Sequence, residues 1–209
     1  MPNESARTGT LLIVAAPSGA GKTSLVKALS ESLTGVAVSV SHTTRARRPR
    51  EQDGVHYHFV DHARFEAMID AGEFLEHARV FDQHYGTARA NVARQLVQGI
   101  DVILEIDWQG ARQVRQRMPQ CLSVFIVPPS RAVLEQRLRA RAQDSEEVIA
   151  RRKRAAVEEM RHYHEFDYLV VNDDFEQAVD ALKVIVLASR QRLAPQAAAR
   201  RELLESLLA

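Results

Sequence analysis

The stretch LLIVAAPSGAGKTSL (residues 11–25) decides the fold. An apolar run leads directly into a glycine-containing loop and then into a helix-like pattern. The loop follows the phosphate-binding pattern G-x-x-x-x-G-K-[ST], with Gly21, Lys22 and Thr23 in register and Ala16 in place of the first glycine. Alanine is tolerated there unless the position needs a positive φ, which glycine adopts far more readily. The stretch therefore predicts a strand, a phosphate loop and a helix that begins at Lys22.

The loop has the chemistry of a nucleotide site. Backbone N–H groups can surround an anion, and the N-terminus of the following helix favours negative charge. We expect Lys22 to reach the β- and γ-phosphates and Thr23 to bind Mg²⁺ through its hydroxyl. The residues expected to contact the nucleotide are Ala16, Pro17, Ser18, Gly19, Ala20, Gly21, Lys22, Thr23 and Ser24. The alternative is a glycine-rich turn of purely structural origin.

An acid is also needed to hold the metal ion. Asp107 ends the apolar stretch DVILEID (101–107), where a Mg²⁺-binding acid is expected. Glu105 lies two residues earlier on the same side of the predicted strand. Asp107 has an alternative role, as the residue that caps the helix beginning in WQGARQ.

The rest of the chain alternates between short apolar runs and helical patterns. The predicted strands are 10–16, 101–107, 122–128 and 167–173, and the predicted helices are 22–33, 109–118, 130–141 and 175–193. This alternation predicts an α/β fold with a parallel sheet flanked by helices. The strands are nearly continuous in apolar residues, so we expect both of their faces to be covered. Ser130 is the expected N-cap of its helix.

Two segments depart from this alternation. Residues 36–87 are polar and suggest short strands around a helix at 62–72, and residues 141–152 are charged and break a helix. These are the expected places for a substrate-binding lobe and a lid. We therefore expect one domain, with its core at about 8–38, 89–130 and 153–193, a lobe at about 39–88, a lid at about 131–152 and a tail at 194–209.

Composition narrows the functional classes only in part. The 209 residues include 28 Lys and Arg against 27 Asp and Glu, so the net charge of +1 indicates no strongly acidic or basic partner. The single Cys121 excludes a disulfide framework, is expected to be buried, and fits a reducing cytosol. No apolar run approaches the length of a transmembrane helix, and the polar N-terminus has no signal-peptide pattern. We therefore expect a cytoplasmic protein with no membrane partner.

A second substrate site is indicated downstream of the loop. The segment SVSHTTRARRPREQDGVHYHF (39–59) combines hydroxyls with guanidinium groups, which bind phosphate in a bidentate manner. Two tyrosines, Tyr57 and Tyr85, add phenol hydroxyls that suit a phosphate monoester. A carboxylate can accept the adjacent N1–H and N2–H₂ donors of guanine, a pair that adenine lacks. Glu76, together with Ser41 and Thr87, is therefore predicted to bind guanine.

The chain resembles the guanylate kinases, most closely the bacterial enzymes. The resemblance covers residues of about 10–190 and includes, in order, APSGAGK, SVSHTTR, GVHYHFV, FLEHARVF, YGTAR, DVILEIDWQGA, FIVPPS, RAQDSEEVIARR and YLVVNDD. It implies ATP with Mg²⁺ as the phosphoryl donor and GMP as the acceptor, in purine nucleotide metabolism. It also implies that alanine is accepted at position 16.

The resemblance assigns roles to individual residues. It implies GMP-phosphate contacts from Arg45, Arg48, Tyr57 and Tyr85; guanine contacts from Ser41, Glu76 and Thr87; a place for Asp107 in the GMP site; catalytic arginines at Arg137, Arg141 and Arg152 beside Lys22; metal binding by Thr23 and Asp107; and a position near adenine for Asn172. One departure from the family pattern T-T-R-x-P-R-x-G-E is that Arg47 replaces proline and Arg50 replaces glycine. Which of Arg47, Arg48 and Arg50 contacts phosphate is therefore left open.

Three other functions compete with this interpretation. The first is a kinase for another nucleoside monophosphate, and the second is a guanylate-kinase-like binding module without catalysis. Intact Lys22, Thr23 and Asp107 weigh against the second. The third is a P-loop ATPase that acts on nucleic acid through its basic segments. The favoured interpretation has ATP and GMP as partners and no nucleic acid, and it leaves open a homo-oligomer.

Overall fold

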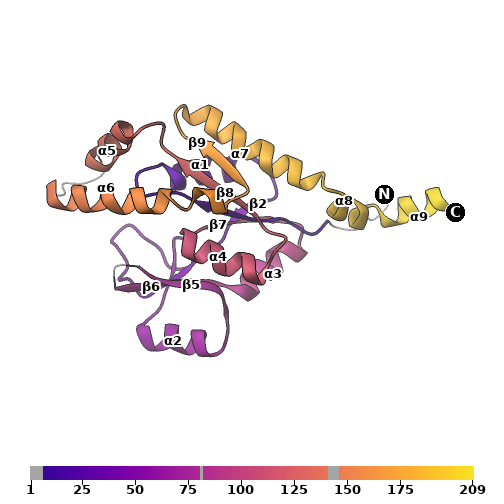
Figure 1. The fold of residues 1–209 in the computed structure, drawn as a ribbon. Helices are drawn as coiled ribbons and strands as arrows, with labels where there is room; N and C mark the ends of the chain where they lie inside the picture. Colours follow the sequence, from indigo (N-terminus) through magenta and orange to yellow (C-terminus); the bar gives the residue numbers. More distant parts are fainter. Residues whose placement is uncertain (1–6, 81, 141–145) are drawn as a thin grey trace.

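The computed structural model describes residues 7–80, 82–140 and 146–209, and its centre is a parallel five-stranded sheet (Figure 1). The strand order is β2 (Val36–Val38), β7 (Asp101–Glu105), β1 (Leu11–Ala15), β8 (Leu122–Val127) and β9 (Tyr168–Val171). β1 pairs with β7 on one side and with β8 on the other. The predicted parallel α/β architecture is confirmed, and β2 lies at the start of residues 36–87, where the sequence suggested short strands without giving their bounds.

Helices cover both faces of this sheet. Side chains alternate between the faces of a strand, so Leu12 and Val14 of β1 enter a different core from Leu11 and Ile13. α1 (Lys22–Ser32) and α7 (Phe175–Arg190) contribute to the first core. α3 (Arg89–Val97) and α4 (Trp108–Arg117) contribute to the second, which also contains Cys121, buried as predicted.

The expectation that all four predicted strands are covered on both faces is wrong for β9. Three of its four residues are exposed, and only Val170 is buried. β9 lies at the edge of the sheet, next to β8. A continuous apolar run cannot distinguish such an edge strand from a central one, because the missing cover is a property of the tertiary arrangement.

The segment predicted to bind the second substrate forms a separate small sheet. Its strand order is β4 (His58–Phe59), β3 (His42–Thr43), β6 (Gln83–Ala88) and β5 (Phe74–Val80). Helix α2 (His62–Asp70) packs on it through Phe65 and Met68, and the ring of Phe65 stacks on Phe74 with centroids 4.5 Å apart. Figure 1 shows α2, β5 and β6 beneath the main sheet, connected to it beside α3 and α4.

A pair of helices accounts for the described part of residues 131–160, and residues 141–145 of the predicted charged break fall outside the described residues. α5 (Arg131–Ala140) begins after Ser130, whose hydroxyl accepts from the Val133 N–H at 3.2 Å, as expected of an N-cap. α6 (Glu146–Met160) lies beside α5 and buries Ala156 against Leu134 and Leu138. A 3₁₀ turn, η1 (Tyr163–Glu165), then leads into β9.

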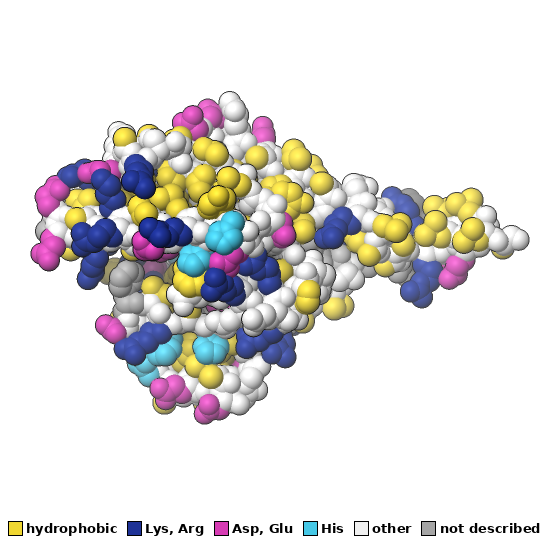
Figure 2. All heavy atoms as spheres, in the orientation of Figure 1, with side chains coloured by type: hydrophobic (Ala, Val, Ile, Leu, Met, Phe, Trp, Pro, Cys, Tyr) yellow, Lys and Arg dark blue, Asp and Glu magenta, His cyan; other side chains and the backbone are white. Residues whose placement is uncertain are grey.

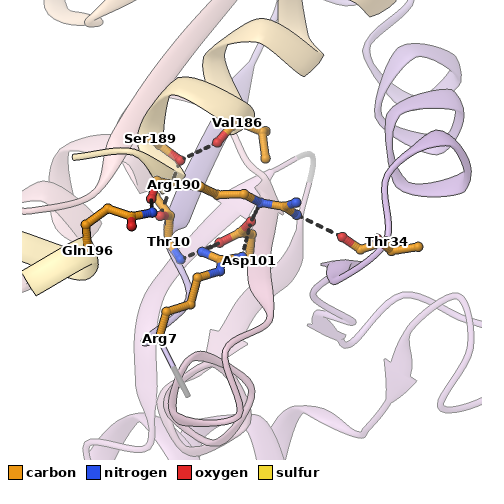
Figure 3. Close-up of polar contacts among 8 residues, drawn as sticks. All are labelled: Arg7, Thr10, Thr34, Asp101, Val186, Ser189, Arg190 and Gln196. Atoms are coloured by element: carbon orange, nitrogen blue, oxygen red, sulfur yellow. Dashed lines mark hydrogen bonds and ion pairs between the residues drawn. The ribbon is translucent and has the colours of Figure 1, made fainter. Parts of the chain in front are cut away.

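An ionic cluster joins segments that are far apart in sequence (Figure 3). Asp101, 1% exposed, accepts two 2.9 Å bonds from Arg7, one of 2.7 Å from the Thr10 N–H and one of 2.8 Å from Arg190. Burial alone would raise the pKa of Asp101, but these bonds outweigh burial and lower it. The cluster lies where β7 begins, and the phosphate loop lies at the opposite ends of the parallel strands. The cluster therefore stabilises the fold away from the site.

The C-terminal segment, predicted only as a tail, forms two short helices. α8 (Leu193–Ala199) and α9 (Arg201–Leu208) extend away from the body of the protein (Figure 1). The space-filling view shows hydrophobic side chains along this projection (Figure 2). The exposed large hydrophobic residues of this segment are Leu193, Leu203, Leu204, Leu207 and Leu208. Among the described residues, none of the helices has the length and apolar character needed to cross a membrane.

Candidate active site

The phosphate loop connects β1 to α1, and α1 begins at Lys22 as predicted. Gly19 and Gly21 adopt φ angles of 89° and 91°, in the left-handed region that glycine tolerates. Asp82 is the one non-glycine residue with a positive φ in the part of the chain that the structure describes. Ala16 therefore has an ordinary backbone conformation, which explains why this position does not need glycine.

Asn172 holds the loop from the side of β9. Its amide Nδ2 donates to the Ala20 carbonyl at 2.7 Å, and the side chain is 4% exposed. The same Nδ2 lies 2.5 Å from where a Cβ on Gly21 would be, so a larger residue at position 21 would clash. The backbone carbonyl of Asn172 in turn accepts from the guanidinium of Arg137 in α5 at 3.1 Å. The side chain placed near adenine by resemblance is thus engaged with the loop itself.

Lys22 lies among acidic groups. Its Nζ donates to the Ile106 carbonyl at 3.2 Å. Desolvation lowers the pKa of Lys22, while the carboxylates of Glu105, Glu159 and Asp107 counteract this shift. The carboxylates favour the charged form of Lys22, and an ammonium at this position can neutralise charge on a phosphate bound in the loop.

The two candidate metal-binding acids have different contacts. Glu105, the last residue of β7, accepts from the Thr23 hydroxyl at 3.0 Å. Asp107 accepts from the Gly110 N–H at 2.8 Å and is the N-cap of α4, which is the alternative role considered for it. The structure therefore pairs the loop hydroxyl with Glu105. Asp107 retains a second carboxylate oxygen, and together these groups offer the oxygen ligands that Mg²⁺ prefers.

A cavity of about 270 Å³ lies between the small lobe and the end of the main sheet. Its lining includes six of the predicted site residues: Lys22, Ser41, Tyr57, Glu76, Tyr85 and Asp107. These residues come from segments separated by up to 85 positions, counted from Lys22 to Asp107 (107 − 22). The phosphate-loop lysine and the predicted guanine-binding acid therefore line a single space.

Glu76 is the buried acid of this cavity, only 4% exposed. β5 and β6 place it opposite Thr87, whose hydroxyl donates to its Oε1 at 2.6 Å. Burial raises the pKa of Glu76 to about 7, the bond from Thr87 opposes the shift, and Asp107 adds to it. Thr87 is fully buried, so in this structure it orients the carboxylate from behind. Helix α4 packs close by, since a Cβ on Gly110 would lie 2.8 Å from Glu76 Oε2.

Arg45 is the first of the arginines predicted to bind phosphate. Its guanidinium binds Glu51 in a bidentate manner at 2.7 and 3.0 Å and lies 5.4 Å from the centre of the Tyr57 ring. The bond from Arg45 lowers the pKa of Glu51 to about 2, so Glu51 keeps its charge at neutral pH. Glu51 also accepts from the Arg48 N–H at 2.8 Å. This carboxylate therefore orders the loop that carries the arginines.

The remaining predicted residues are less closely grouped. The side chains of Arg47, Arg48 and Arg50 are exposed, and neither geometry nor burial selects one of them as the phosphate contact. Arg152 lies on α6, and Arg141 falls outside the described residues. Tyr57 and Tyr85 lie near each other, with ring centroids 6.0 Å apart.

One residue at the site has no counterpart in the sequence interpretation. Glu159, near the end of α6, accepts from the Ser18 N–H of the phosphate loop at 3.2 Å. Its spacing of seven residues from Arg152 places the two on the same face of α6, and this spacing was the only sequence signal for it.

The comparisons with known proteins agree on one family. A family model described as guanylate kinase matches residues 8–189. The guanylate kinase of Alkalilimnicola ehrlichii is 60% identical over 200 residues, covering 96% of this chain and 98% of the relative. That of Salmonella typhimurium is 55% identical over 203 residues, with coverage of 96% and 98%.

A solved structure gives the same result. The crystal structure of guanylate kinase from Anaplasma phagocytophilum matches with a TM-score of 0.76 and 33% identity, covering 96% of this chain and 95% of that one. The phosphate loop, the cavity that joins Lys22 to Glu76 and these matches over nearly the whole length lead to the same conclusion. The chain belongs to the guanylate kinase family.

Proposed function

We propose the residue roles by which this chain, a nucleoside monophosphate kinase, catalyses ATP:GMP phosphotransfer. The observation that carries the assignment is the single cavity lined by both Lys22 and Glu76. A base held at Glu76 and a donor phosphate held at Lys22 would place the acceptor phosphate between them. The position of phosphoryl transfer would then lie between Lys22, Tyr57 and Tyr85.

Guanine selection is assigned to Glu76. Its ionised carboxylate can accept from both N1–H and N2–H₂ of guanine, with Thr87 fixing its orientation from behind and Ser41 across the cavity. Adenine presents an acceptor at N1 and would leave the buried carboxylate opposed to a lone pair. A site built from buried hydrogen-bonding groups rejects such an analogue strongly.

Transfer is assigned to charge neutralisation and alignment. The acceptor oxygen of GMP is already anionic, so the attack on the γ-phosphorus needs no strong general base. Lys22 stabilises the transferring group, Arg45 with Tyr57 and Tyr85 holds the GMP phosphate, and Arg137, Arg141 and Arg152 are assigned to the transferring phosphoryl group. Arg48 is assigned to the same phosphate, and the loop backbone from Ala16 to Ser24 holds the donor.

The oxygen-rich donor set near the loop fits Mg²⁺. The Thr23 hydroxyl lies 3.0 Å from Glu105 Oε2, and Asp107 adds a further carboxylate at the end of the same strand segment. We assign Thr23 and Asp107 as metal-binding residues and add Glu105 to them. A Mg²⁺ ion held by these residues would supply charge neutralisation for the donor phosphates.

The cellular context is part of the same proposal. A cytoplasmic location is supported by the single buried thiol of Cys121, since a reducing compartment keeps such a thiol free. ATP and GMP are the proposed partners, with no role for nucleic acid. The exposed leucines of α9 leave a homo-oligomer open.

A coupled assay of ADP release with GMP, AMP, UMP and TMP as acceptors tests the substrate assignment. GMP should be used at a kcat/KM at least about 10³ times that of AMP, because a buried acid opposed to the wrong base edge is costly. Equal use of two acceptors would refute the role of Glu76. ATP turnover that rises with RNA instead of GMP would favour an ATPase that acts on nucleic acid.

A further inference from the structure

A carboxylate outside the assigned machinery reaches the phosphate loop. Glu159 Oε2 accepts from the Ser18 N–H at 3.2 Å, although Ser18 and Glu159 are 141 residues apart. Glu159 is half-buried, and it acts electrostatically on the ammonium of Lys22. One carboxylate thus interacts with both kinds of group that a phosphate loop offers to an anion, a backbone N–H and the loop lysine.

These interactions have a consequence for nucleotide binding. A phosphate group that enters the loop seeks the same N–H groups and the same ammonium. It also carries the same sign of charge as Glu159. The carboxylate and the phosphate cannot share these donors without repulsion, because like charges at close range disfavour each other. The neighbouring acids Glu105 and Asp107 add to the negative potential around Lys22.

We propose that Glu159 competes with the donor phosphates for the phosphate loop and thereby sets the affinity for ATP. The contact from α6 holds the Ser18 end of the loop in place, and the incoming triphosphate displaces the carboxylate. Glu159 is a positioning residue in this scheme: it acts on the loop, and it takes no part in the transfer. The proposal rests on the assignment of the loop to ATP.

The location of Glu159 connects this competition to the lid. Arg152 precedes it by seven residues on α6, about two turns and therefore on the same face, roughly 10.5 Å along the helix axis. The displacement of Glu159 therefore acts on the helix that carries a proposed catalytic arginine. ATP that expels the carboxylate frees the end of α6, where the lid helices meet the core.

Two variants separate the charge of Glu159 from its shape. Glu159→Gln keeps the length of the side chain and an oxygen that can accept from the Ser18 N–H, but it removes the charge. Glu159→Asp keeps the charge and shortens the side chain by one methylene. Glu158→Gln is the matched control, because Glu158 is the adjacent residue, is 68% exposed and pairs with Arg161 at the surface.

Calorimetric titration of each purified variant with MgATP and with MgADP measures the effect directly. Glu159→Gln should bind MgATP about fivefold more tightly than wild type, and MgADP by a smaller factor because it has less charge to repel. The gain should shrink at high salt, which screens charges. Glu159→Asp and Glu158→Gln should stay close to wild type.

Unchanged or weaker MgATP binding by Glu159→Gln would overturn the proposal, as would an equal gain for MgADP and MgATP. An equal gain in Glu159→Asp would also overturn it, since the charge would then not be the cause. Turnover of GMP by the wild-type protein in the coupled assay is measured in parallel. Failure of that turnover would contradict the proposed substrate, whereas the binding titrations test Glu159 independently of the acceptor.

Discussion

The buried carboxylate of Glu76 should lower the free energy of unfolding at neutral pH. Burial raises the pKa of Glu76 from its usual value of 4.5 to about 7, a rise of about 2.5. The folded protein therefore binds a proton at Glu76 more tightly than the unfolded chain does. Stability from this group is complete below the unfolded pKa and is lost as the pH rises from 4.5 towards 7. The full loss is about 3 kcal/mol, at about 1.36 kcal/mol for each pKa unit.

Urea unfolding of wild type and Glu76→Gln at about pH 5 and about pH 8 measures this loss. Glutamine keeps an oxygen to accept from the Thr87 hydroxyl and never ionises, so its stability should not follow the pH through this window. The stability of Glu76→Gln relative to wild type should rise by about 2.5 kcal/mol between the two pH values. In thermal unfolding this equals roughly 5 to 10 °C for a chain of this size.

The exposed Glu158→Gln variant is the control, and its stability relative to wild type should be the same at both pH values. The same relative stability of Glu76→Gln at both pH values would refute the reasoning. It would mean that the carboxylate is not desolvated in the folded protein, or that Arg117, which lowers the pKa of Glu76, fully compensates for its charge.

The same substitution tests the function of the acid. Glutamine would place an NH₂ group against a donor of guanine, so the KM for GMP should rise by about 10- to 100-fold while the KM for ATP stays constant. In wild type, the KM for GMP should fall as the pH rises through about 7, because only the ionised carboxylate accepts both guanine donors. The GMP phosphate titrates near pH 6, so the profile of Glu76→Gln serves as the reference.

Three further changes test other parts of the molecule. Lys22→Ala should lower kcat by about 10³-fold while circular dichroism and thermal unfolding remain those of a folded protein, and retained turnover would remove the lysine from the mechanism. Asn172→Ala removes the amide that holds the Ala20 carbonyl, so the KM for ATP should rise by about fivefold with the KM for GMP unchanged; an equal rise of both would contradict a role confined to the loop. Asp101→Asn leaves two arginines unpaired and should cost about 3 kcal/mol in urea unfolding with kcat unchanged, whereas unaltered stability would show that the cluster does not stabilise the fold.

The elements around the phosphate loop could be predicted from the sequence because their determinants are local. The apolar run of β1, the glycines of the turn and the helix start at Lys22 lie within a single short stretch. The grouping of Glu76 with Ser41 and Tyr57 could also be predicted, and the structure brings these three residues to one cavity, while the role of Glu76 in binding guanine stays a prediction. In both cases, residue type and short-range order were sufficient.

Contacts between distant segments could not be predicted in the same way. Asp101 reads as the first residue of a strand, and only the fold brings Arg7 and Arg190 to it. Glu159 reads as one of many charges on a helix with exposed faces, and its contact with Ser18 depends on how α6 lies against the loop. The choice between Glu105 and Asp107 as partner of Thr23 also needed coordinates, since both acids end the same apolar run.

The distribution of charge around Lys22 explains why the proposed mechanism draws on arginines from outside the core. Four carboxylates act electrostatically on the ammonium of Lys22: those of Glu105, Glu159, Asp107 and Glu76. One ammonium among four acids gives a cavity that cannot by itself neutralise two nucleotides with their phosphates end to end. In the proposed mechanism, the remaining positive charge comes with the substrate as a metal ion and from the arginines of the lobe and of α5 and α6. In the proposed mechanism, efficient transfer therefore requires donor, acceptor and the arginines assigned to the transfer to be present together, and this condition disfavours transfer to water when GMP is missing.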